Sequence, residues 1–190
     1  VGATVCSTTE HSKVESADRV ILPGVGAFSS GMIELARNGL DDALKNVSRA
    51  GRPILGICLG MQMLFDVSHE YGMYNGLGLI PGSVLPMNSK IDGVRKRKIP
   101  HVGWNELRRP ECRDSWKNSC LQDMGPEGFC YFSHSYMAVP KNCEDALAIV
   151  DYQGLEFVAA AQRANVTGLQ FHPELSGKVG LKVLRQFLSI

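Results

Sequence analysis

The hydrophobic positions of this chain change their spacing several times, and these changes mark the expected secondary structure. Short apolar runs at residues 3–7, 19–22 and 53–57 have the length and composition of buried parallel strands. Between them, apolar residues recur every three or four positions, as on one face of a helix. This alternation predicts an α/β fold with a mostly parallel sheet flanked by helices.

Two amphipathic helices are expected between the second and third strands. Gly39 separates them, because glycine is unfavourable inside a helix. A last helix is expected at the carboxyl end, with Ser176 as its N-cap residue. The three apolar faces consist of Met32, Leu35 and Ala36, of Leu40, Leu44 and Val47, and of Val179, Val183, Leu184, Phe187 and Leu188.

The pattern changes between residues 79 and 171. Short strands separated by Gly, Pro and Asn, as in GFCYFSHSYMAV and LEFVAAAQRANVTGLQF, predict antiparallel hairpins added to the sheet. Residues 105–128 are polar and contain proline and glycine, so we expect a long surface excursion there. Neither a linker nor an internal repeat divides the sequence, and residues 1–190 are predicted to form a single domain.

Composition narrows the classes of function. Of the 190 residues 44% are hydrophobic, and the net charge is +1, so bulk charge gives no reason to expect nucleic acid or an acidic membrane as partner. No stretch approaches the roughly 18 consecutive apolar residues of a membrane span. The N-terminus lacks the basic and apolar regions of a signal peptide. We therefore expect a cytoplasmic protein.

The cysteines and histidines do not have the spacing of metal ligands. The six cysteines form no C-x-x-C pair, and the five histidines contain no H-x-x-x-H. We therefore expect neither a metal site nor a cofactor.

A cysteine stands where the third apolar run changes to helical spacing. In GICLG, Cys58 follows the expected strand and precedes apolar residues that continue at helical spacing to Phe65. This G-x-C-x-G pattern is the thiol form of the nucleophile elbow, in which Gly56 and Gly60 allow helix and strand to run close together. A helix N-terminus favours the thiolate. The alternative is a buried structural cysteine.

The segment GLQFHPELSG offers a base for this cysteine. His172 and Glu174 are two residues apart and face the same side of an extended segment, which Pro173 favours at His172. Glu174 can then fix the imidazole tautomer that takes the proton of Cys58. The alternative for His172 alone is a hydrogen-bonded histidine at the end of a strand.

A third motif, ILPGVGAF, ends a strand in a glycine-rich turn. Gly24 and Gly26 allow positive φ angles and a close approach of the backbone to a ligand. Backbone N–H groups near Val25 and Gly26 can complete an oxyanion hole with that of Leu59. Neither phosphate-loop pattern, G-x-x-x-x-G-K-[ST] or G-x-G-x-x-G, is present.

Together these motifs resemble those of the class I glutamine amidotransferases, whose triad is Cys, His and Glu. From about residue 17 to the C-terminus, the chain is similar to the glutamine amidotransferase subunit of imidazole glycerol phosphate synthase. HPE and G-x-C-x-G are shared by the whole superfamily, whereas PGVGAF joined to PHVGWN is much more specific. The similar segments, in order, are LPGVGAF, GICLGMQMLF, IPHVGWNEL, YFSHSY and GLQFHPELSG.

The resemblance implies a role for each matching residue. Cys58 attacks the side-chain amide of glutamine, His172 protonates the departing ammonia, and water then releases glutamate. Glu174 completes the triad. For Ser135 and Tyr136 the role of ordinary strand residues remains open. The residues implied to bind glutamine are Gly26, Gln62, Ser135 and Tyr136.

The resemblance also implies a partner. Ammonia passes through a channel to a (β/α)₈ cyclase subunit, with which the chain forms a heterodimer that makes imidazole glycerol phosphate in histidine biosynthesis. Trp104 and Asn105 match the stretch that faces the cyclase, although a tryptophan there also suits a core. The basic run RKRK at residues 95–98 is either a solvated face or part of the docking surface.

The chain departs from the family pattern at its N-terminus. Family members begin with a further strand, a glycine-containing loop and a helix before the segment that corresponds to residues 2–7. This N-terminal strand and helix unit is therefore expected to be absent, and we expect a truncated chain.

Three other functions remain open. A paralogous subunit of this type feeds ammonia to a different synthase, including one that amidates a sugar. A stand-alone thiol hydrolase of the same fold cleaves γ-glutamyl or peptide bonds, but it gives no reason for PHVGWN. A non-catalytic partner subunit is the third possibility, against which the intact Cys58, His172 and Glu174 argue.

Overall fold

The structure, a computed structural model, describes residues 1–90, 96–125 and 128–190. Its strands are β1 (Val20–Gly24), β2 (Ile54–Cys58), β3 (Phe65–Ser68), β4 (Tyr74–Asn75), β5 (Ile80–Pro86), β6 (His101–Glu106), β7 (Phe129–His134), β8 (Tyr136–Pro140), β9 (Ala146–Tyr152), β10 (Leu155–Arg163) and β11 (Val166–Leu169). Its helices are α1 (His11–Ser16), α2 (Phe28–Arg37), α3 (Leu40–Arg49), α4 (Leu59–Met63) and α5 (Gly177–Phe187), with 3₁₀ turns η1 (Cys143–Asp145) and η2 (Pro173–Leu175).

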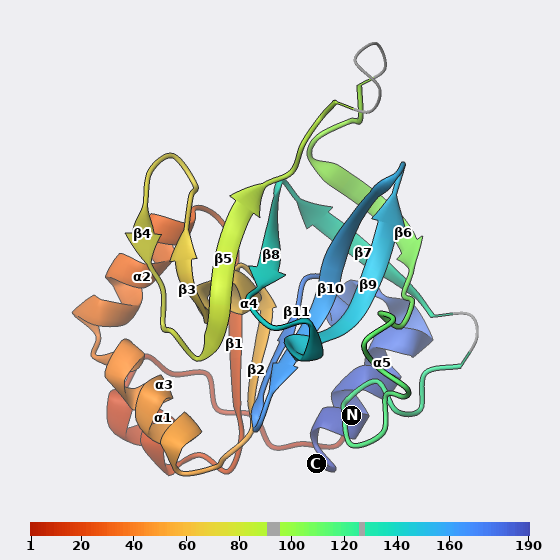
Figure 1. The fold of residues 1–190 in the computed structure, drawn as a ribbon. Coiled ribbons are helices and arrows are strands. Elements are labelled where there is room, and N and C mark those ends of the chain that lie inside the picture. Colours follow the sequence, from red (N-terminus) through yellow and green to blue (C-terminus); the bar gives the residue numbers. More distant parts are fainter. Residues whose placement is uncertain (91–95, 126–127) are drawn as a thin grey trace.

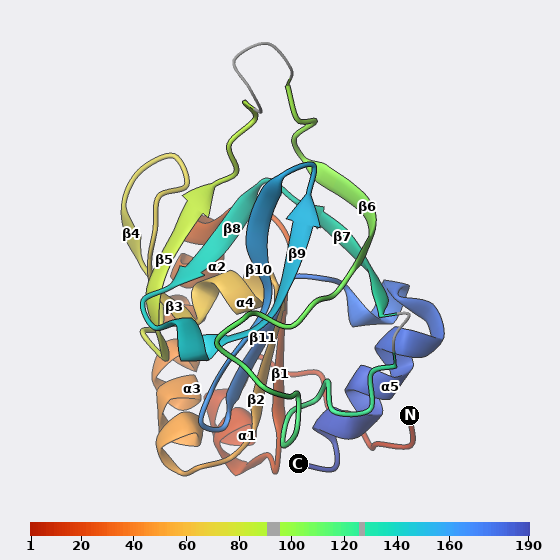
Figure 2. The ribbon, with the colours of Figure 1, turned by 45° about the vertical axis from the view of Figure 1, so that its right-hand side comes forward.

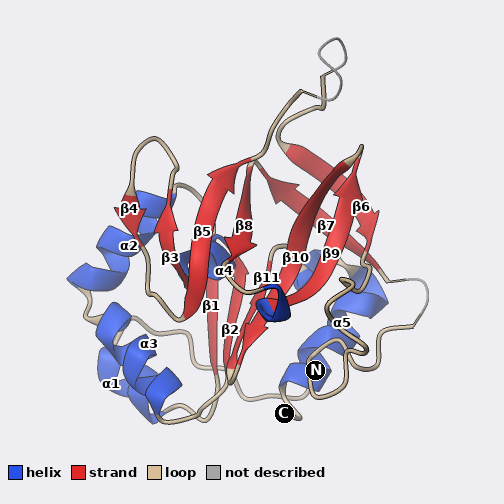
Figure 3. Cartoon of the chain, in the orientation of Figure 1, coloured by secondary structure: helices blue, strands red, loops and turns tan. Residues whose placement is uncertain are grey.

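Within the described residues, nine strands form one mixed sheet. Its order is β1-β2-β11-β10-β8-β5-β3-β4, with β9 paired to β10, while β6 and β7 form a separate antiparallel pair (Figures 1 and 3). The pairs β1–β2, β2–β11 and β3–β5 are parallel, and the other pairs of the main sheet are antiparallel. The predicted α/β fold with added antiparallel strands is thus confirmed.

Helices cover the parallel part of the sheet on both faces. Alternate side chains of β2 enter different hydrophobic clusters: Ile54 packs with residues of α1 to α4, whereas Leu55 and Ile57 pack with residues of α5. Figure 1 accordingly shows α1, α2 and α3 on one side of the strands and α5 on the other. Because β2 is buried on both faces, it reads as a continuous apolar run rather than an alternating one.

The two helices predicted between the second and third strands are confirmed. They are α2 and α3, and Gly39 lies between them with φ 66°. This left-handed conformation suits glycine and ends the first helix before the second begins.

The strand predicted at residues 3–7 is wrong. These residues form no regular element, and Val5 is 83% exposed. The apolar side chains of the run are Ala3, Val5 and Cys6, of which two are small, and β1 has β2 as its neighbour in the sheet rather than this segment. A strand without a hydrogen-bonded neighbour has little stability of its own.

The helix expected after Cys58 is shorter than its apolar spacing indicates. The helix α4 ends at Met63, and Phe65 already begins β3. The carbonyl oxygens of Met63, Leu64 and Phe65 accept hydrogen bonds from the backbone of residues 77–80, so pairing with a distant segment replaces the next helical turn.

The antiparallel hairpins are only partly as expected. The strands β9 and β10 pair as a hairpin, and β10 and β11 are also antiparallel neighbours. In GFCYFSHSYMAV, however, β7 pairs with β6 whereas β8 pairs with β5 and β10. The view in Figure 2 shows β6 and β7 side by side and apart from β8. Ser135 is the residue at which the chain passes from one sheet to the other.

The polar stretch at residues 105–128 is not wholly a surface excursion. Its first residues belong to β6, and Leu107, Cys120 and Leu121 are buried in the cluster that contains α5. A few apolar side chains therefore anchor an otherwise polar loop.

Candidate active site

The backbone at Cys58 forms a sharp turn between β2 and α4. Cys58 has φ 55°, a conformation that residues other than glycine rarely adopt. A Cβ atom added at Gly60 would lie 1.8 Å from the carbonyl oxygen of Leu22, and one added at Gly56 would lie 2.7 Å from the backbone of Gly60. The two glycines therefore allow the contact between strand and helix that the motif predicts.

A cleft of about 560 Å³ opens beside Cys58. It collects side chains from the turn after β1, from α4, from the segment after β3, and from the β7–β8 and η2 regions. The cleft is lined by Val25, Gly26, Cys58, Leu59, Gln62, Glu70, Tyr71, Tyr131, Ser133, His134, Ser135, Tyr136, His172 and Leu175. Every residue that the sequence analysis assigned to the oxyanion hole or to glutamine binding lies on this cleft.

The thiol of Cys58 is buried and protonated at rest. Among the described residues, its hydrogen-bond partners are the Ser133 carbonyl oxygen, at 3.9 Å, and the Gln170 amide, at 3.8 Å. Burial raises the pKa of Cys58 to about 11, the Leu59 N–H lowers it, and the Glu174 carboxylate raises it further. The Leu59 N–H thus favours the thiolate as the turn predicts, but desolvation outweighs this backbone donor, and the net shift of the Cys58 pKa is upward.

His172 is held by the carboxylate that the sequence predicts. His172 Nδ1 lies 2.8 Å from Glu174 Oε1, so His172 Nε2 remains available on the cleft side. The backbone differs from the expected extended segment, because Pro173 begins the 3₁₀ turn η2 and only His172 is extended. The turn brings the carboxylate back to the ring, while Glu174 itself lies outside the cleft lining.

Ser176 holds the His172 segment against β7. Its hydroxyl donates to the His172 carbonyl oxygen at 2.6 Å and accepts from the Tyr131 N–H at 3.0 Å. The His172 N–H donates in turn to the Tyr131 carbonyl oxygen at 2.9 Å. Ser176 does stand at the N-cap position of α5, but its side chain makes no capping hydrogen bond, contrary to the prediction.

The turn after β1 contributes backbone to the opposite side of the cleft. Val25 is exposed, and Gly26 has φ 101°, a conformation that favours glycine. The Glu70 carboxylate accepts a hydrogen bond from the Phe28 N–H at 2.5 Å, at the start of α2. Glu70 also lines the cleft and is a residue that the sequence analysis missed.

Gln62 and Gln170 form a buried amide pair behind the thiol. Gln62 Nε2 donates to Gln170 Oε1 at 3.0 Å and to the Tyr136 carbonyl oxygen at 3.3 Å. These bonds use both hydrogens of the Gln62 amide and leave its oxygen as an acceptor at the cleft. Gln170 was also missed, although its place directly after β11 and two residues before His172 was a signal that could have identified it.

Trp104 and Asn105 lie on β6, outside the cleft lining. Trp104 is 53% exposed and contacts the Tyr131 ring edge-on, with 5.9 Å between the ring centroids. Tyr131 lines the cleft, so the exposed surface at Trp104 adjoins it.

The basic run at residues 95–98 is only partly described, because residue 95 lies outside the described residues. Its Arg97 side chain is buried, and the guanidinium donates hydrogen bonds to the Tyr152 and Gln153 carbonyl oxygens.

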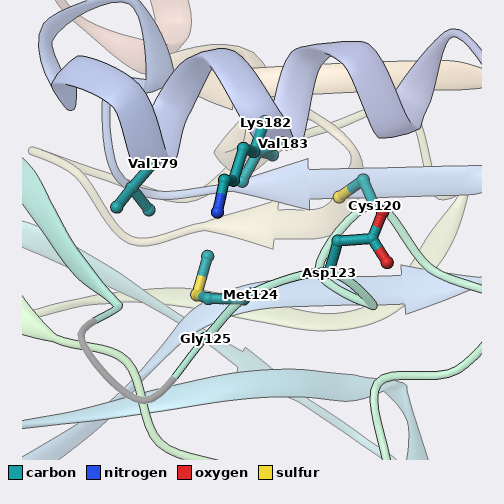
Figure 4. Close-up of a pocket in the computed structure, with 7 residues that line it drawn as sticks. All are labelled: Cys120, Asp123, Met124, Gly125, Val179, Lys182 and Val183. Atoms are coloured by element: carbon teal, nitrogen blue, oxygen red, sulfur yellow. The ribbon is translucent and has the colours of Figure 1, made fainter.

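A smaller cavity of about 300 Å³ lies between α5 and the loop before β7 (Figure 4). Its lining shares no residue with the cleft, and burial raises the pKa of its cysteine, Cys120, to about 12.

Within residues 1–90, 96–125 and 128–190, no cluster of three or more His, Cys, Asp or Glu side chains has a metal-binding arrangement. No helix in the described part of the chain is long and apolar enough to cross a membrane.

The chain is similar to known proteins over almost its whole length. The family model of class-I glutamine amidotransferases matches residues 3–190. The chain is 43% identical over 189 residues to the imidazole glycerol phosphate synthase subunit HisH 1 of Legionella pneumophila, covering 99% of this chain and 88% of that protein. It is 41% identical over 190 residues to the HisH subunit of Wolinella succinogenes, covering 100% and 89% of the two chains.

Solved structures agree on the fold. The crystal structure of a glutamine amidotransferase superposes with a TM-score of 0.70 at 16% identity, covering 99% of this chain and 86% of the other. The PurLQS structure from Thermotoga maritima superposes with a TM-score of 0.61 at 22% identity, covering 89% and 78%. The chain therefore belongs to the class I glutamine amidotransferases and, within them, to the family of HisH subunits of imidazole glycerol phosphate synthase.

Proposed function

We propose that this chain is the glutamine-hydrolysing subunit of an imidazole glycerol phosphate synthase, which acts in histidine biosynthesis. The observation that carries the proposal is the shared cleft of Cys58 and His172, with His172 oriented by Glu174 at 2.8 Å. This arrangement supplies the nucleophile, base and orienting carboxylate that hydrolysis of an amide needs.

The reaction begins with loss of the thiol proton. His172 Nε2 accepts this proton, and the Cys58 sulfur attacks the side-chain amide carbon of glutamine. Backbone N–H groups of Leu59 and of the turn at Val25 and Gly26 stabilise the oxyanion of the tetrahedral intermediate. His172 then gives its proton to the departing nitrogen, which leaves as ammonia. Water, deprotonated by the same imidazole, cleaves the glutamyl thioester to glutamate.

The polar groups of the cleft suit the amino acid end of glutamine. The Glu70 carboxylate lines the cleft and can pair with the α-ammonium group, and the free Gln62 oxygen is a second acceptor for it. Tyr136 and Ser135 bound the same space. The α-ammonium group of the substrate is thus recognised by acceptors other than the Glu174 carboxylate, which does not line the cleft.

The ammonia acceptor in this proposal is a (β/α)₈ cyclase subunit. Trp104 and Asn105 form part of the surface that binds it, because an exposed aromatic side chain next to the cleft is a favourable anchor for a protein partner. The reaction needs no cofactor, since the thiol and imidazole carry out each covalent step.

The test measures glutamate release by the chain in complex with a purified cyclase subunit and its nucleotide substrate. The Cys58→Ala variant is expected to lose glutamine-dependent turnover, while added ammonia still supports the cyclase. Cys112→Ala, which changes an exposed cysteine outside the cleft, is the matched control and should keep both activities.

Other outcomes identify the competing functions. Glutamate release that persists in Cys58→Ala contradicts the assigned nucleophile. Turnover in the absence of any partner favours a stand-alone hydrolase. Stimulation by a sugar-amidating synthase, but not by the cyclase, identifies the paralogous function instead.

A further inference from the structure

Two buried histidines outside the triad contact each other beside the cleft. His101 Nδ1 lies 3.1 Å from His134 Nε2, and the two residues are 1% and 6% exposed. On their far sides, His101 Nε2 lies 3.0 Å from Asn105 Oδ1, and His134 Nδ1 lies 2.8 Å from the Tyr136 carbonyl oxygen. Both nitrogens of both rings are therefore in hydrogen-bond contact with protein atoms.

The contacts continue from this pair to the nucleophile. The Tyr136 carbonyl oxygen that faces His134 also accepts from Gln62 Nε2. Gln62 is bonded to Gln170, and the Gln170 amide contacts Cys58 Sγ. A continuous chain of hydrogen bonds thus runs from β6 to the thiol.

The outer part of this chain has too few donors when its groups are neutral. It begins at the Asp151 carbonyl oxygen and ends at the Tyr136 carbonyl oxygen, and both can only accept. Between them lie the Asn105 amide, His101 and His134, each of which, when neutral, has one donating and one accepting side. The four contacts therefore have only three donors, whichever way the amide and the rings are turned. The histidines therefore bind one more proton, or the exposed contact between Asn105 and Asp151 opens to water.

The surroundings of the pair act in both directions. The bond to Asn105 raises the pKa of His101 and the bond to the Tyr136 carbonyl oxygen raises that of His134, but burial outweighs both bonds, so that the net pKa of His101 is lowered and that of His134 falls to about 3. His172, on the cleft side, is a further titratable group whose charge opposes protonation of His134.

Aromatic rings surround the pair on other elements. The Tyr152 ring of β9 lies 4.1 Å from the His101 ring, the Phe132 ring of β7 lies 5.1 Å from it, and the Phe157 ring of β10 lies 5.0 Å from the His134 ring, between centroids. Of these only Tyr152 is titratable, and the charged Arg97 lies beyond it, bonded to its carbonyl oxygen. Aromatic faces attract a cation, so the Phe132 and Tyr152 rings, which lie at 26° and 33° to the His101 ring, favour an imidazolium.

We propose that His101 and His134 are positioning residues of the glutamine cleft, and that one extra proton shared by the two rings holds the Tyr136 carbonyl oxygen and, through it, Gln62. With this proton every contact from Asp151 to Tyr136 has a donor. Without it the chain must give up one contact, and the Gln62 amide loses a fixed partner. The proposal rests on the proposed function in one respect, namely that the cleft binds glutamine.

The proton is tested by ¹⁵N NMR of the imidazole nitrogens in the full chain, labelled at histidine, at neutral pH. The expected result is that three of the four nitrogens of the pair carry a proton, as the hydrogen-bond geometry requires. A spectrum with one protonated nitrogen per ring would overturn the proposal. This measurement needs neither glutamine nor a partner, so it stands even if the proposed function fails.

A variant tests whether the shortage of hydrogen-bond donors is what holds the extra proton on the histidine pair. Asn105→Leu removes the acceptor at His101 Nε2, so that a neutral pair satisfies all of its remaining contacts. The pair is then expected to lose its extra proton at a lower pH than in the unchanged chain. Asn38→Leu, which changes a half-buried asparagine at the C-cap of α2, is the control and should leave the titration in place. An unchanged titration in Asn105→Leu would overturn the assignment.

Kinetics of the complex with the cyclase test the positioning role. His134→Gln keeps a donor and an acceptor but cannot carry the charge. Because Gln62 contacts the amino acid end of glutamine rather than the reacting amide, KM should rise roughly tenfold while kcat changes less than about twofold. If the extra proton is observed but KM is unchanged in this variant, the positioning role is wrong. If the unchanged complex hydrolyses no glutamine, the proposed function is what has failed.

Discussion

Cys58 combines a strained backbone with a buried side chain. Its positive φ directs the residue to the cleft at the end of β2, a conformation that only the surrounding packing maintains. Burial raises the thiol pKa to about 11, so the resting group is a poor nucleophile. The thiol becomes reactive only when a neighbouring base takes its proton, which links attack to the arrangement of His172 and the substrate.

The Glu174→Gln variant separates the reactivity of the free thiol from catalysis. The Glu174 carboxylate raises the Cys58 pKa, so removing its charge should lower that pKa and speed alkylation of Cys58 at a fixed pH between 8 and 10, as mass spectrometry of the Cys58 peptide would show. Glutamine hydrolysis should nevertheless fall by roughly a hundredfold or more, because His172 loses its orienting partner.

The control for this experiment is Glu34→Gln on the exposed face of α2, where the carboxylate pairs with Arg37 and with Asn38 at the end of the helix. Alkylation and hydrolysis should both stay at the level of the unchanged chain. Alkylation and hydrolysis that fall together in Glu174→Gln would indicate a misplaced thiol rather than a lost orienting group.

At the scale of elements, the contact between β1 and α4 depends on the absence of a side chain. Gly60 brings the α4 backbone against the Leu22 carbonyl of β1, and Gly24 at the end of β1 faces Gly60 in turn. The register of β1 and β2 pairs Gly24 with Cys58, so the same contact sets the turn after β1 beside the nucleophile. The glycines of two motifs that are distant in sequence thus pack against each other.

We expect Gly60→Ala to destabilise the protein by about 2–3 kcal/mol, because the added methyl group meets backbone that must move. The measurement is the free energy of unfolding from denaturant titration. Gly125→Ala is the control, since no atom of the described residues lies within 4 Å of a Cβ atom at that position. If the two variants have equal free energies of unfolding, the backbone at the β1–α4 contact moves to accommodate the methyl group without loss of stability.

The segment after β11 contains hydrogen bonds that the helix-capping pattern of its sequence does not predict. Ser176 was expected to cap α5, and its position is indeed the N-cap, but its hydroxyl bonds to His172 and to Tyr131 of β7 instead. The partner on β7 is 45 residues away in sequence, so no local rule identifies it. The consequence is that α5, β7 and the triad histidine are held together by one buried hydroxyl.

At the scale of the whole molecule, the cleft and the proposed partner surface are continuous. The Trp104 ring contacts Tyr131, and Tyr131 lines the cleft. In the proposed function, docking at Trp104 therefore lies one side chain away from the proposed glutamine site. This proximity suits a subunit that must release ammonia to its partner rather than to water.

Trp104→Ala is expected to weaken binding of the cyclase subunit by about 2 kcal/mol, or roughly thirtyfold in Kd, as for an aromatic anchor at an interface. Isothermal titration calorimetry measures this change. The matched control is Tyr74→Ala, an exposed aromatic residue on β4 outside the cleft lining. Similar losses for both variants, or for neither, would place the docking surface elsewhere.

Much of the architecture could be predicted because its signals are local. The apolar runs of β1 and β2, the helical spacing of α2 and α3, and the break at Gly39 each depend on residues close together in sequence. The errors at residues 3–7 and after Met63 arose because pairing with distant strands decides those positions. A short apolar run becomes a strand only if a neighbour completes its hydrogen bonds.

The features of the site likewise divide into those that local sequence identifies and those that depend on contacts between distant residues. The sequence by itself determined that a cysteine stands on a strand-to-helix turn, that a His-x-Glu pair is available, and that a glycine-rich turn follows another strand. The tertiary structure alone decided that these three motifs share a cleft, that burial raises the pKa of the Cys58 thiol, that Gln170 contacts this thiol, and that Glu70 and His134 line the cleft, with His101 in contact with His134. The reason is that desolvation and hydrogen bonding depend on which distant groups become neighbours, and short motifs do not contain that information.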